Sequence, residues 1–254
     1  MRVYSENFRI CLFLFFLIIL LPAKTQTSPP VDGVLFLGFG LQKGIETKEA
    51  ITEGPRPPIH SNFHSKNLAR TFGKSKELIA ISDPGDGSQF DFTNGDSISL
   101  EAWVNVKSLQ PGSYAYILGK GRSGNKAFSN SNQNYAIRLA NSKGRAAISF
   151  LFRDSRTKND VGESLDKLWH RWTSDFGFAL GSGWHHVAIT YQFGKPDSIR
   201  GYIDGKNRSG VWDMGGKTTF APVTDNDSIF IGGGNGDNPS NRFVGKMDSV
   251  AIHR

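Results

Sequence analysis

The segment Trp169-His170-Arg171-Trp172 places two indole rings and a guanidinium group within four residues. Aromatic rings pack on the apolar faces of sugars, and planar polar groups bond to sugar hydroxyls. Residues 160–172 have apolar side chains at a helical spacing, and we interpret them as a loop insertion with one helical turn. Trp169, Arg171 and Trp172 are therefore predicted to bind a carbohydrate ligand. In the alternative interpretation, both tryptophans attach a long loop to the body of the protein.

Two other segments combine aromatic rings with polar groups of the same kind. Tyr116 and Arg138 are predicted to contribute to ligand binding, and Tyr114, Asn134 and Tyr135 are further candidates. Their rings suit sugar C–H surfaces, and their guanidinium and amide groups suit hydroxyls.

Cleavage of a glycosidic bond requires two carboxylates that flank the bond. Glu101 stands alone in its segment, and Asp91 and Asp96 precede it without a spacing that would form such a pair. His185 and His186 cannot chelate one metal ion together, because adjacent residues of a strand point to opposite faces. We therefore expect no catalytic residue, and the sequence predicts a binding protein rather than an enzyme.

Short apolar segments alternate with turn residues from Leu78 onward, which is typical of an all-β protein. The strongest segment is Ser97–Val106, in which every second residue is apolar. Asp204-Gly205 predicts a hairpin, because such turns need positive φ angles. The chain has 29 glycines and no segment with a long helical period. About ten strands without helices predict a two-sheet sandwich or a barrel.

The N-terminal region contains an unbroken apolar run at residues 10–21, which follows two arginines and precedes a proline. This layout predicts a secretory signal peptide over residues 1–25, then a polar spacer over 26–33 and one domain over 34–254. The run is shorter than the roughly 20 residues that span a bilayer. We expect no stable membrane span after cleavage, and an uncleaved anchor is the alternative. Residues 42–70 are polar and proline-rich and are predicted to form a long surface loop.

Export and charge limit the classes of partner. Cys11 is the single cysteine and lies in the predicted signal peptide, so the exported protein, whether secreted, periplasmic or on the cell surface, has no disulfide bond. The formal net charge is +7, spread along the chain without a run of five like charges. This pattern excludes a basic arm that binds nucleic acid, whereas weak attraction to acidic glycans agrees with it.

Five short motifs occur in a fixed order along the chain. They are Phe90–Val104, Ile117–Gly121, Gly183–Tyr191, Tyr202–Lys206, and Ile231–Gly233 with Phe243–Ile252. The series resembles the LamG-like domains of the concanavalin A-like lectin/glucanase superfamily, over about residues 70–254 and more loosely over 34–39. The resemblance implies an all-β jelly-roll sandwich of two curved antiparallel sheets. It places Trp103 and Trp184 between the sheets and returns the last strand to the neighbourhood of the first.

Some relatives of this kind hold one calcium ion at the edge of the sandwich. Calcium takes six to eight oxygen ligands, some of them from carboxylates. Asp248, Asp83 and Asp86 are predicted to be ligands of one structural calcium ion, and Asp225 and Asp227 are further candidates. Asp248 matches an aspartate often seen in the last family motif. The alternative role for Asp248 is to cap a turn or support strand pairing.

Glucanases of the superfamily carry a Glu-x-Asp-x-x-Glu signature or a similar one on one strand, and this chain lacks it. The resemblance therefore implies an exported, non-catalytic module that recognises a carbohydrate or a cell-surface or matrix glycoconjugate. One alternative is a structural or protein-adhesion domain of a larger surface protein, with other domains or proteins as partners. A divergent glycoside hydrolase is a further alternative, which the missing signature disfavours.

Overall fold

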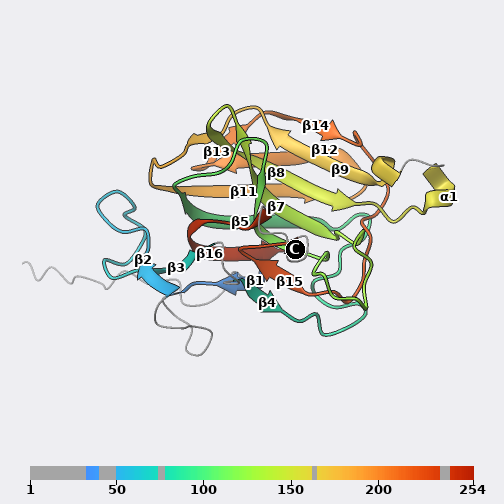
Figure 1. Ribbon diagram of the computed structural model, residues 1–254, viewed down its shortest axis with the longest axis horizontal. Coiled ribbons are helices and arrows are strands. Elements are labelled where there is room, and N and C mark those ends of the chain that lie inside the picture. Colours follow the sequence, from blue (N-terminus) through green and yellow to red (C-terminus); the bar gives the residue numbers. More distant parts are fainter. Residues whose placement is uncertain (1–32, 40–49, 74–77, 162–164, 235–240) are drawn as a thin grey trace, which may run out of the picture.

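Two antiparallel sheets pack face to face in the computed structural model of the protein (Figure 1). The structure describes residues 33–39, 50–73, 78–161, 165–234 and 241–254. The short helices α1 (Lys158–Val161) and η2 (Leu165–Leu168) precede β9. The predicted all-β fold with two antiparallel sheets is confirmed, and the arrangement is a jelly-roll sandwich.

The predicted signal peptide lies outside the described residues, as does nearly all of the predicted spacer. Among the helices that the structure describes, none has the length and apolar character needed to cross a membrane.

Sheet A consists of β1 (Gly33–Leu37), β2 (Ile51–Glu53), β3 (Leu68–Phe72), β5 (Ser97–Val106), β11 (Trp184–Gln192), β12 (Lys195–Ile203), β13 (Lys206–Arg208) and β16 (Gly245–His253). The strand order is β13-β12-β11-β5-β16-β3-β2, and β1 also pairs with β16. Leu37 of β1 lies opposite Val250 of β16. The last strand thus returns to the first, as the family resemblance implies.

Sheet B consists of β4 (Ile79–Ile81), β6 (Tyr114–Lys120), β7 (Tyr135–Ser142), β8 (Arg145–Arg153), β9 (Trp169–Ser174), β10 (Phe178–Ala179), β14 (Gly210–Met214) and β15 (Ile229–Ile231). The order is β14-β9-β8-β7-β6-β15-β4, and β10 also pairs with β8. β15 pairs with β4 on one side and β6 on the other, although it is far along the chain from both strands.

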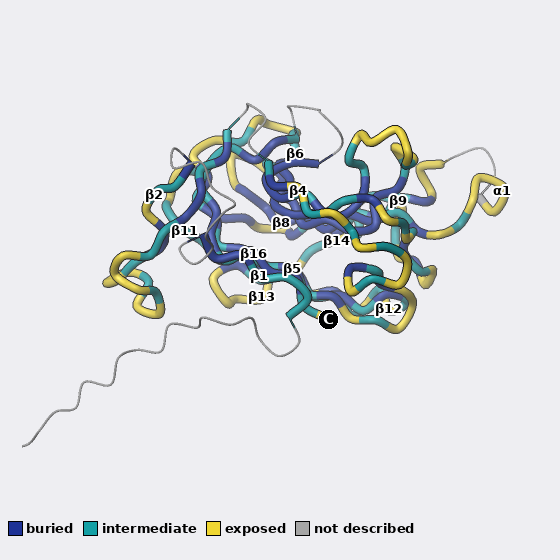
Figure 2. Tube along the Cα trace, turned by 90° about the horizontal axis from the view of Figure 1, so that it is seen from below, coloured by how far each residue is buried: buried dark blue, intermediate teal, exposed yellow. Residues whose placement is uncertain are grey.

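The core lies between the sheets, where each strand contributes every second side chain. In β5, Leu100, Ala102 and Val104 are fully buried, whereas Glu101 and Trp103 face outward and are half-buried. Across the core, the rings of Phe150 and Phe152 from β8 meet Tyr191 of β11 with centroid distances of 5.4 and 5.7 Å. Figure 2 shows buried residues along the paired strands and exposed residues mainly in the connecting loops.

Trp103 and Trp184 do not fill the space between the sheets, so that expectation is wrong. Directly opposed residues share a face, and Trp103 of β5 lies opposite His186 of β11 on the outer face of sheet A. Trp103 packs instead against the loop before β3, with His60 and Phe63 at ring-centroid distances of 5.0 and 5.1 Å. The apolar neighbours of Trp103 face the core, and strand alternation therefore turns the indole outward.

The predicted surface loop over residues 42–70 also needs correction, because its described part includes β2 and the start of β3. These strands pair with Ile51 opposite Arg70, and residues 54–67 form the loop that connects them. Its prolines lie where no ladder hydrogen bond is required. Asn67 Nδ2 donates to Asp248 Oδ2 at 2.8 Å and fixes this loop to β16.

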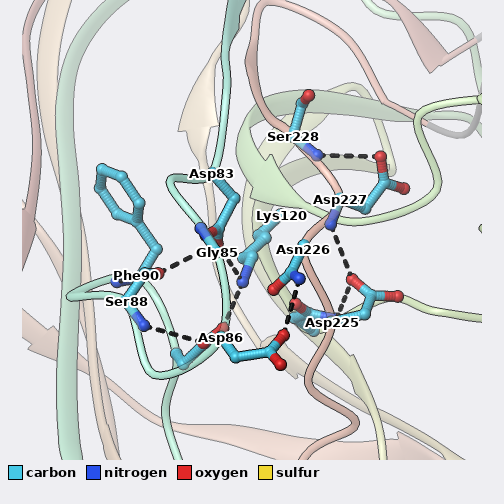
Figure 3. Close-up of polar contacts among 12 residues, drawn as sticks. Asp83, Gly85, Asp86, Ser88, Phe90, Lys120, Asp225, Asn226, Asp227 and Ser228 are labelled. Atoms are coloured by element: carbon cyan, nitrogen blue, oxygen red, sulfur yellow. Dashed lines mark hydrogen bonds and ion pairs between the residues drawn. The ribbon is translucent and has the colours of Figure 1, made fainter.

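A buried ammonium group joins β6 to the loop after β4. Lys120 Nζ lies 2.6 Å from Asp83 Oδ2 and also contacts Asp91, and the side chains of Lys120 and Asp83 are 0% exposed (Figure 3). Burial raises the pKa of Asp83, but hydrogen bonds from Lys120 and the Gly85 N–H outweigh it and leave the pKa below its ordinary value. The ammonium and the carboxylates thus stabilise each other in a region that water does not reach.

Replacing Lys120 by methionine would leave Asp83 buried without its cation. We expect the free energy of unfolding to fall by about 3–5 kcal/mol at neutral pH, as measured by urea denaturation. Because the folded-state pKa of Asp83 is lowered, its contribution is present above the ordinary aspartate pKa and is lost as the pH falls through the folded-state value. The difference in the free energy of unfolding between wild type and variant should therefore become smaller at acidic pH.

The matched control is Lys217→Met, which removes an ammonium group that pairs with Asp197 on the exposed surface. This change is expected to alter the free energy of unfolding by less than about 1 kcal/mol. Equal effects of the two substitutions would contradict the role assigned to Lys120.

Candidate functional site

Strand β9 carries the strongest predicted binding segment and determines which of its side chains reach the surface. Its residues alternate between half-buried and buried, so Trp169 and Arg171 lie on the outer face of sheet B and His170 and Trp172 on the inner face. The prediction of a loop at residues 169–172 is wrong, because these residues pair with both β8 and β14. The helical spacing belongs to α1 and η2, which precede the strand.

Trp172 lies in the core and not at a binding surface. The residue is 3% exposed, and it is opposite Phe150 of β8 and Trp212 of β14. Its indole packs on the bare backbone of Gly201 in sheet A, where a Cβ atom would come within 2.6 Å of the ring. The predicted role of Trp172 in ligand binding is therefore wrong, because an indole enclosed between the sheets cannot face a ligand.

Four other residues meet on the outer face of sheet B, where β6, β7 and β9 present them. Tyr116 lies opposite Arg138, and the guanidinium carbon of Arg138 is 4.3 Å from the ring centroid of Tyr114 and 5.3 Å from that of Tyr116. The guanidinium carbon of Arg171 is 4.8 Å from the same Tyr114 centroid. We call Tyr114, Tyr116, Arg138 and Arg171 the Arg–Tyr cluster.

Arg138 is the buried cation of the cluster. The residue is 5% exposed, and its Nη2 donates to Ser149 Oγ at 3.0 Å. Its Nε has no hydrogen-bond partner, and no carboxylate of the described residues pairs with the guanidinium group. Burial lowers the pKa of Arg138, which Tyr116 and Tyr114 partly offset and Arg171 lowers further. Within the described part of the chain, the partners of this cation are thus a serine hydroxyl and two tyrosine rings, although buried charges in proteins are normally paired.

The accessible part of this face lies beside Arg138. The Arg171 side chain is 21% exposed, and its Nε lies 2.7 Å from Asp213 Oδ1. Trp169 is half-buried, with the guanidinium carbon of Arg122 4.9 Å from its ring. Tyr114 is also half-buried. Short-range sequence patterns missed Arg122 and Asp213, because both reach the face from loops or strands far along the chain.

The remaining predicted ligand-binding residues are buried. Tyr116 is 1% exposed, and its hydroxyl lies 3.2 Å from Gln133 Oε1. Tyr135 points into the core, its hydroxyl donates to the Phe90 carbonyl at 3.2 Å, and burial raises its pKa well above the ordinary value. Asn134 is 1% exposed as well. The buried Tyr116 ring therefore packs against the Arg138 guanidinium group. Asn134 and Tyr135 do not belong to the Arg–Tyr cluster.

The three aspartates that were predicted to share a calcium ion lie apart. Asp83 is bound to the buried lysine described above, and Asp86 accepts a hydrogen bond from Asn226 at 2.7 Å (Figure 3). Asp248 belongs to sheet A and accepts its hydrogen bond from Asn67; burial raises its pKa, and the hydrogen bonds offset only part of that rise. Asp248 is in β16 of sheet A, whereas Asp83 and Asp86 are in the loop after β4, so the three carboxylates do not fit one shared ion. Searching the described residues finds no group of three His, Cys, Asp or Glu side chains placed to hold a metal ion.

The carboxylates of Asp225 and Asp227, the further calcium-ligand candidates, lie close together. Asn132 Nδ2 donates to Asp225 Oδ2 at 2.6 Å and to Asp227 Oδ2 at 3.0 Å. Asn134 Nδ2 lies 3.4 Å from Asp225 Oδ1, and Asn134 Oδ1 is buried without a hydrogen-bond partner. Two carboxylates and an uncommitted amide oxygen are the hard donors that calcium prefers.

His185 and His186 point to opposite faces, as strand alternation predicts. The His185 ring stacks on Phe178 at a centroid distance of 4.3 Å. His186 faces outward, and its Nε2 lies 3.0 Å from Glu101 Oε2.

Comparison with known structures finds distant similarity. Domain 4 of AbnA, an extracellular arabinanase from Geobacillus stearothermophilus solved with arabinotriose, shares 16% identity over 74% of this chain and 71% of that chain, with a TM-score of 0.44. A variant of the NanB sialidase from Streptococcus pneumoniae shares 14% identity over 87% of this chain but only 26% of its own length, with a TM-score of 0.48. The CBM40 domain of the Ruminococcus gnavus IT-sialidase, bound to α2,3-sialyllactose, shares 14% identity over 70% of this chain and 89% of that chain, with a TM-score of 0.44.

Comparison with curated proteins finds no match. A protein family described as the concanavalin A-like lectin/glucanases superfamily matches residues 80–254, which is more than half of the chain. The two-sheet sandwich agrees with this match, and the laminin G-like resemblance of the sequence motifs is confirmed. The protein belongs to the concanavalin A-like lectin/glucanases superfamily.

Proposed function

We propose that the protein is an exported, non-catalytic module that binds a carbohydrate through the outer face of sheet B, and that the carbohydrate carries an acidic group. The observation that supports this proposal is the buried guanidinium of Arg138, which has no carboxylate partner in the described residues. The superfamily to which the protein belongs takes its description from lectins and glucanases, two classes that act on carbohydrates.

The positive charge of Arg138 contributes to the electrostatic potential at the surface, because no carboxylate of the described residues pairs with it. Its field acts through the low-dielectric interior and adds to that of Arg171, whose guanidinium contacts the same Tyr114 ring. A carboxylate or sulfate of a sugar would form charge-assisted hydrogen bonds with Arg171, which is the accessible cation of the pair. Arg138 would stabilise the bound anion by long-range electrostatic attraction, without direct contact.

The rings on this face supply the second half of sugar recognition. Tyr114 and Trp169 are both half-buried; two guanidinium groups lie against the Tyr114 ring and one lies against the Trp169 ring. Such stacking holds each ring in one orientation, and Trp169 is the ring that we propose to pack on the C–H groups of a sugar. Asp213 is the carboxylate beside these residues, and its ion pair with Arg171 gives it a positioning role rather than a catalytic one.

The first test is a glycan array on the purified protein, with acidic and neutral members of each sugar class. Acidic glycans are expected to bind, and the signal should weaken with added salt because the Arg171 side chain is partly exposed to solvent. Arg171→Ala is expected to weaken this binding by roughly 10- to 100-fold, since it removes charge-assisted hydrogen bonds.

The matched control is Arg200→Ala, which removes the same charge from an exposed position on β12 of sheet A. It is expected to leave glycan binding unchanged. Equal losses in the two variants, or binding of neutral glycans alone, would contradict the assignment to the Arg–Tyr cluster. A folded protein with a blank array would favour the protein-adhesion alternative.

The substitution Arg138→Met tests whether Arg138 contributes to the stability of the fold or to ligand binding. The substitution removes a desolvated, unpaired charge and keeps an apolar stem between the two tyrosines. We expect the melting temperature to stay the same or rise by a few degrees, while binding of acidic glycans falls at least about tenfold. A large fall in melting temperature would show that Arg138 has a structural role only.

Calcium remains part of the proposal, but at Asp225 and Asp227 rather than at the three aspartates that do not converge. If these carboxylates hold the ion, excess calcium should raise the melting temperature by a few degrees relative to EGTA, because a ligand of the folded state stabilises it by mass action. Asp225→Asn should abolish this difference, and Asp86→Asn should preserve it. Equal melting temperatures with calcium and with EGTA would overturn the metal site.

A further inference from the structure

A groove crosses the outer face of sheet A, on the opposite side of the sandwich from the Arg–Tyr cluster. It consists of two adjoining cavities of about 390 and 590 Å³, which share Trp103 and His186 as lining residues. Loop 54–67 forms one wall and contributes His60 to the smaller cavity and Phe63 to the larger. Neither the sequence motifs nor the proposed glycan face accounts for this groove.

Four rings and one carboxylate surround the smaller cavity. The rings belong to His60, Trp103, Trp184 and His186, and the carboxylate belongs to Asp204. The antiparallel register of β5 and β11 places both tryptophans and His186 on one face, because directly opposed residues share a face. Most of the lining is therefore the carbon surface of aromatic rings.

The hairpin between β12 and β13 holds Asp204 at the rim. Asp204 has a positive φ of 52°, and its Oδ1 accepts a hydrogen bond from the His186 N–H at 3.0 Å. Its Oδ2 lies 2.8 Å from His185 Nδ1, and 45% of its side chain is exposed. The carboxylate is thus fixed in position and open to a ligand.

The described lining of the smaller cavity contains one carboxylate, that of Asp204. Burial lowers the pKa of His60, although Asp204 raises it and His185 lowers it again, so His60 is neutral at and above neutral pH. No lysine or arginine of the described residues lines this cavity. The carboxylate of Asp204 is therefore partnered by the His185 imidazole and not by a lysine or arginine of the described lining.

The larger cavity also has a carboxylate in its lining, that of Glu101. Glu101 lies between His186 Nε2 at 3.0 Å and His253 Nε2 at 2.9 Å. Hydrogen bonding by His186 lowers the pKa of Glu101, burial opposes it, and His253 lowers it further. The carboxylate is thus ionised and fixed by two imidazoles, while Lys66 lines the part of the groove formed by the loop.

We propose that the smaller cavity binds the side-chain ammonium group of a lysine on a partner protein. The faces of tryptophan attract cations through the ring quadrupole, and a neighbouring carboxylate adds direct charge complementarity. The apolar lining suits the methylene stem that leads to the ammonium group. An anionic ligand is disfavoured because Asp204 and Glu101 would repel it.

Three small probes separate the charge from the shape of the ligand. They are Nα-acetyl-lysine N-methylamide, its norleucine counterpart, which has the same stem without the ammonium group, and methyl glucosaminide, an amino sugar. Each is titrated into the full protein, and the indole N–H signals of Trp103 and Trp184 are followed by NMR. The lysine probe is expected to shift both signals in a saturable manner, and the norleucine probe is expected to shift neither.

Asp204→Asn removes the charge but keeps a side chain that accepts hydrogen bonds and tolerates positive φ. It is expected to weaken lysine binding roughly three- to tenfold. Trp184→Phe assigns one of the two indole signals and should weaken binding by a smaller factor, because a phenyl ring attracts cations less than an indole does. Arg200→Ala, on β12 and outside the lining, is the control and should leave the affinity unchanged.

Several outcomes would overturn the proposal. Equal shifts with the lysine and norleucine probes would show an apolar pocket without charge recognition. Saturable binding of methyl glucosaminide alone would assign the groove to a sugar. Absence of any shift in a folded protein, or a lysine affinity that Asp204→Asn leaves unchanged, would contradict the assigned site. None of these outcomes depends on the Arg–Tyr cluster, which lies on the other sheet.

Discussion

The packing of sheet A against sheet B imposes the constraint on which the rest of the molecule depends. Each strand contributes alternate side chains to the buried layer, so a shift of one residue decides between core and surface. In β9 this rule sends Trp172 inward against Gly201 and leaves Trp169 and Arg171 outside. In β11 it separates His185 from His186. The candidate binding surfaces therefore consist of the side chains that point away from the layer between the sheets. Their composition follows from the same strand alternation that forms the core.

Charged groups inside the sandwich show how unusual Arg138 is. Lys120 is held by Asp83 and Asp91, and His170 lies between the Asp154 carboxylate and the Gly216 carbonyl, each 2.9 Å away. These buried groups have partners of opposite charge or strong acceptors, which is the arrangement that offsets the loss of water. Arg138 has tyrosine rings and one serine hydroxyl instead. A fold that places carboxylates beside Lys120 and His170, but none of the described ones beside Arg138, retains an anion-attracting position near its surface, which is a reason to connect Arg138 with ligand binding rather than with stability.

Local patterns in the sequence predict the strands well, because alternation and turn residues are short-range signals. The bounds expected for β5 agree with the structure. The sequence predicts a loop at residues 169–172 because the apolar spacing of the preceding helical turns, α1 and η2, continues to Trp172. The Arg–Tyr cluster could be predicted as a set of residue types but not as an arrangement. Its members meet only through the pairing of β6, β7, β8 and β9, and that register includes an irregularity between Tyr116 and Leu118 that no local pattern indicates. The groove on sheet A depends on loop 54–67, whose position is fixed by the distant contact between Asn67 and Asp248.

The two outer faces differ in charge, and this difference bears on how the proposed ligands would combine. Arginines and tyrosines occupy the face of sheet B, whereas carboxylates, imidazoles and indoles line the groove on sheet A. Both layers of the sandwich separate the two faces, so ligands bound on each share no contact residue. Sites without shared partners are expected to act additively, and coupling between them would require a second state of the fold that each ligand favours differently. A rigid sandwich with an acidic glycan on one face and a lysine-bearing protein on the other would therefore act as a bridge between them, with the affinity for each partner set by its own face.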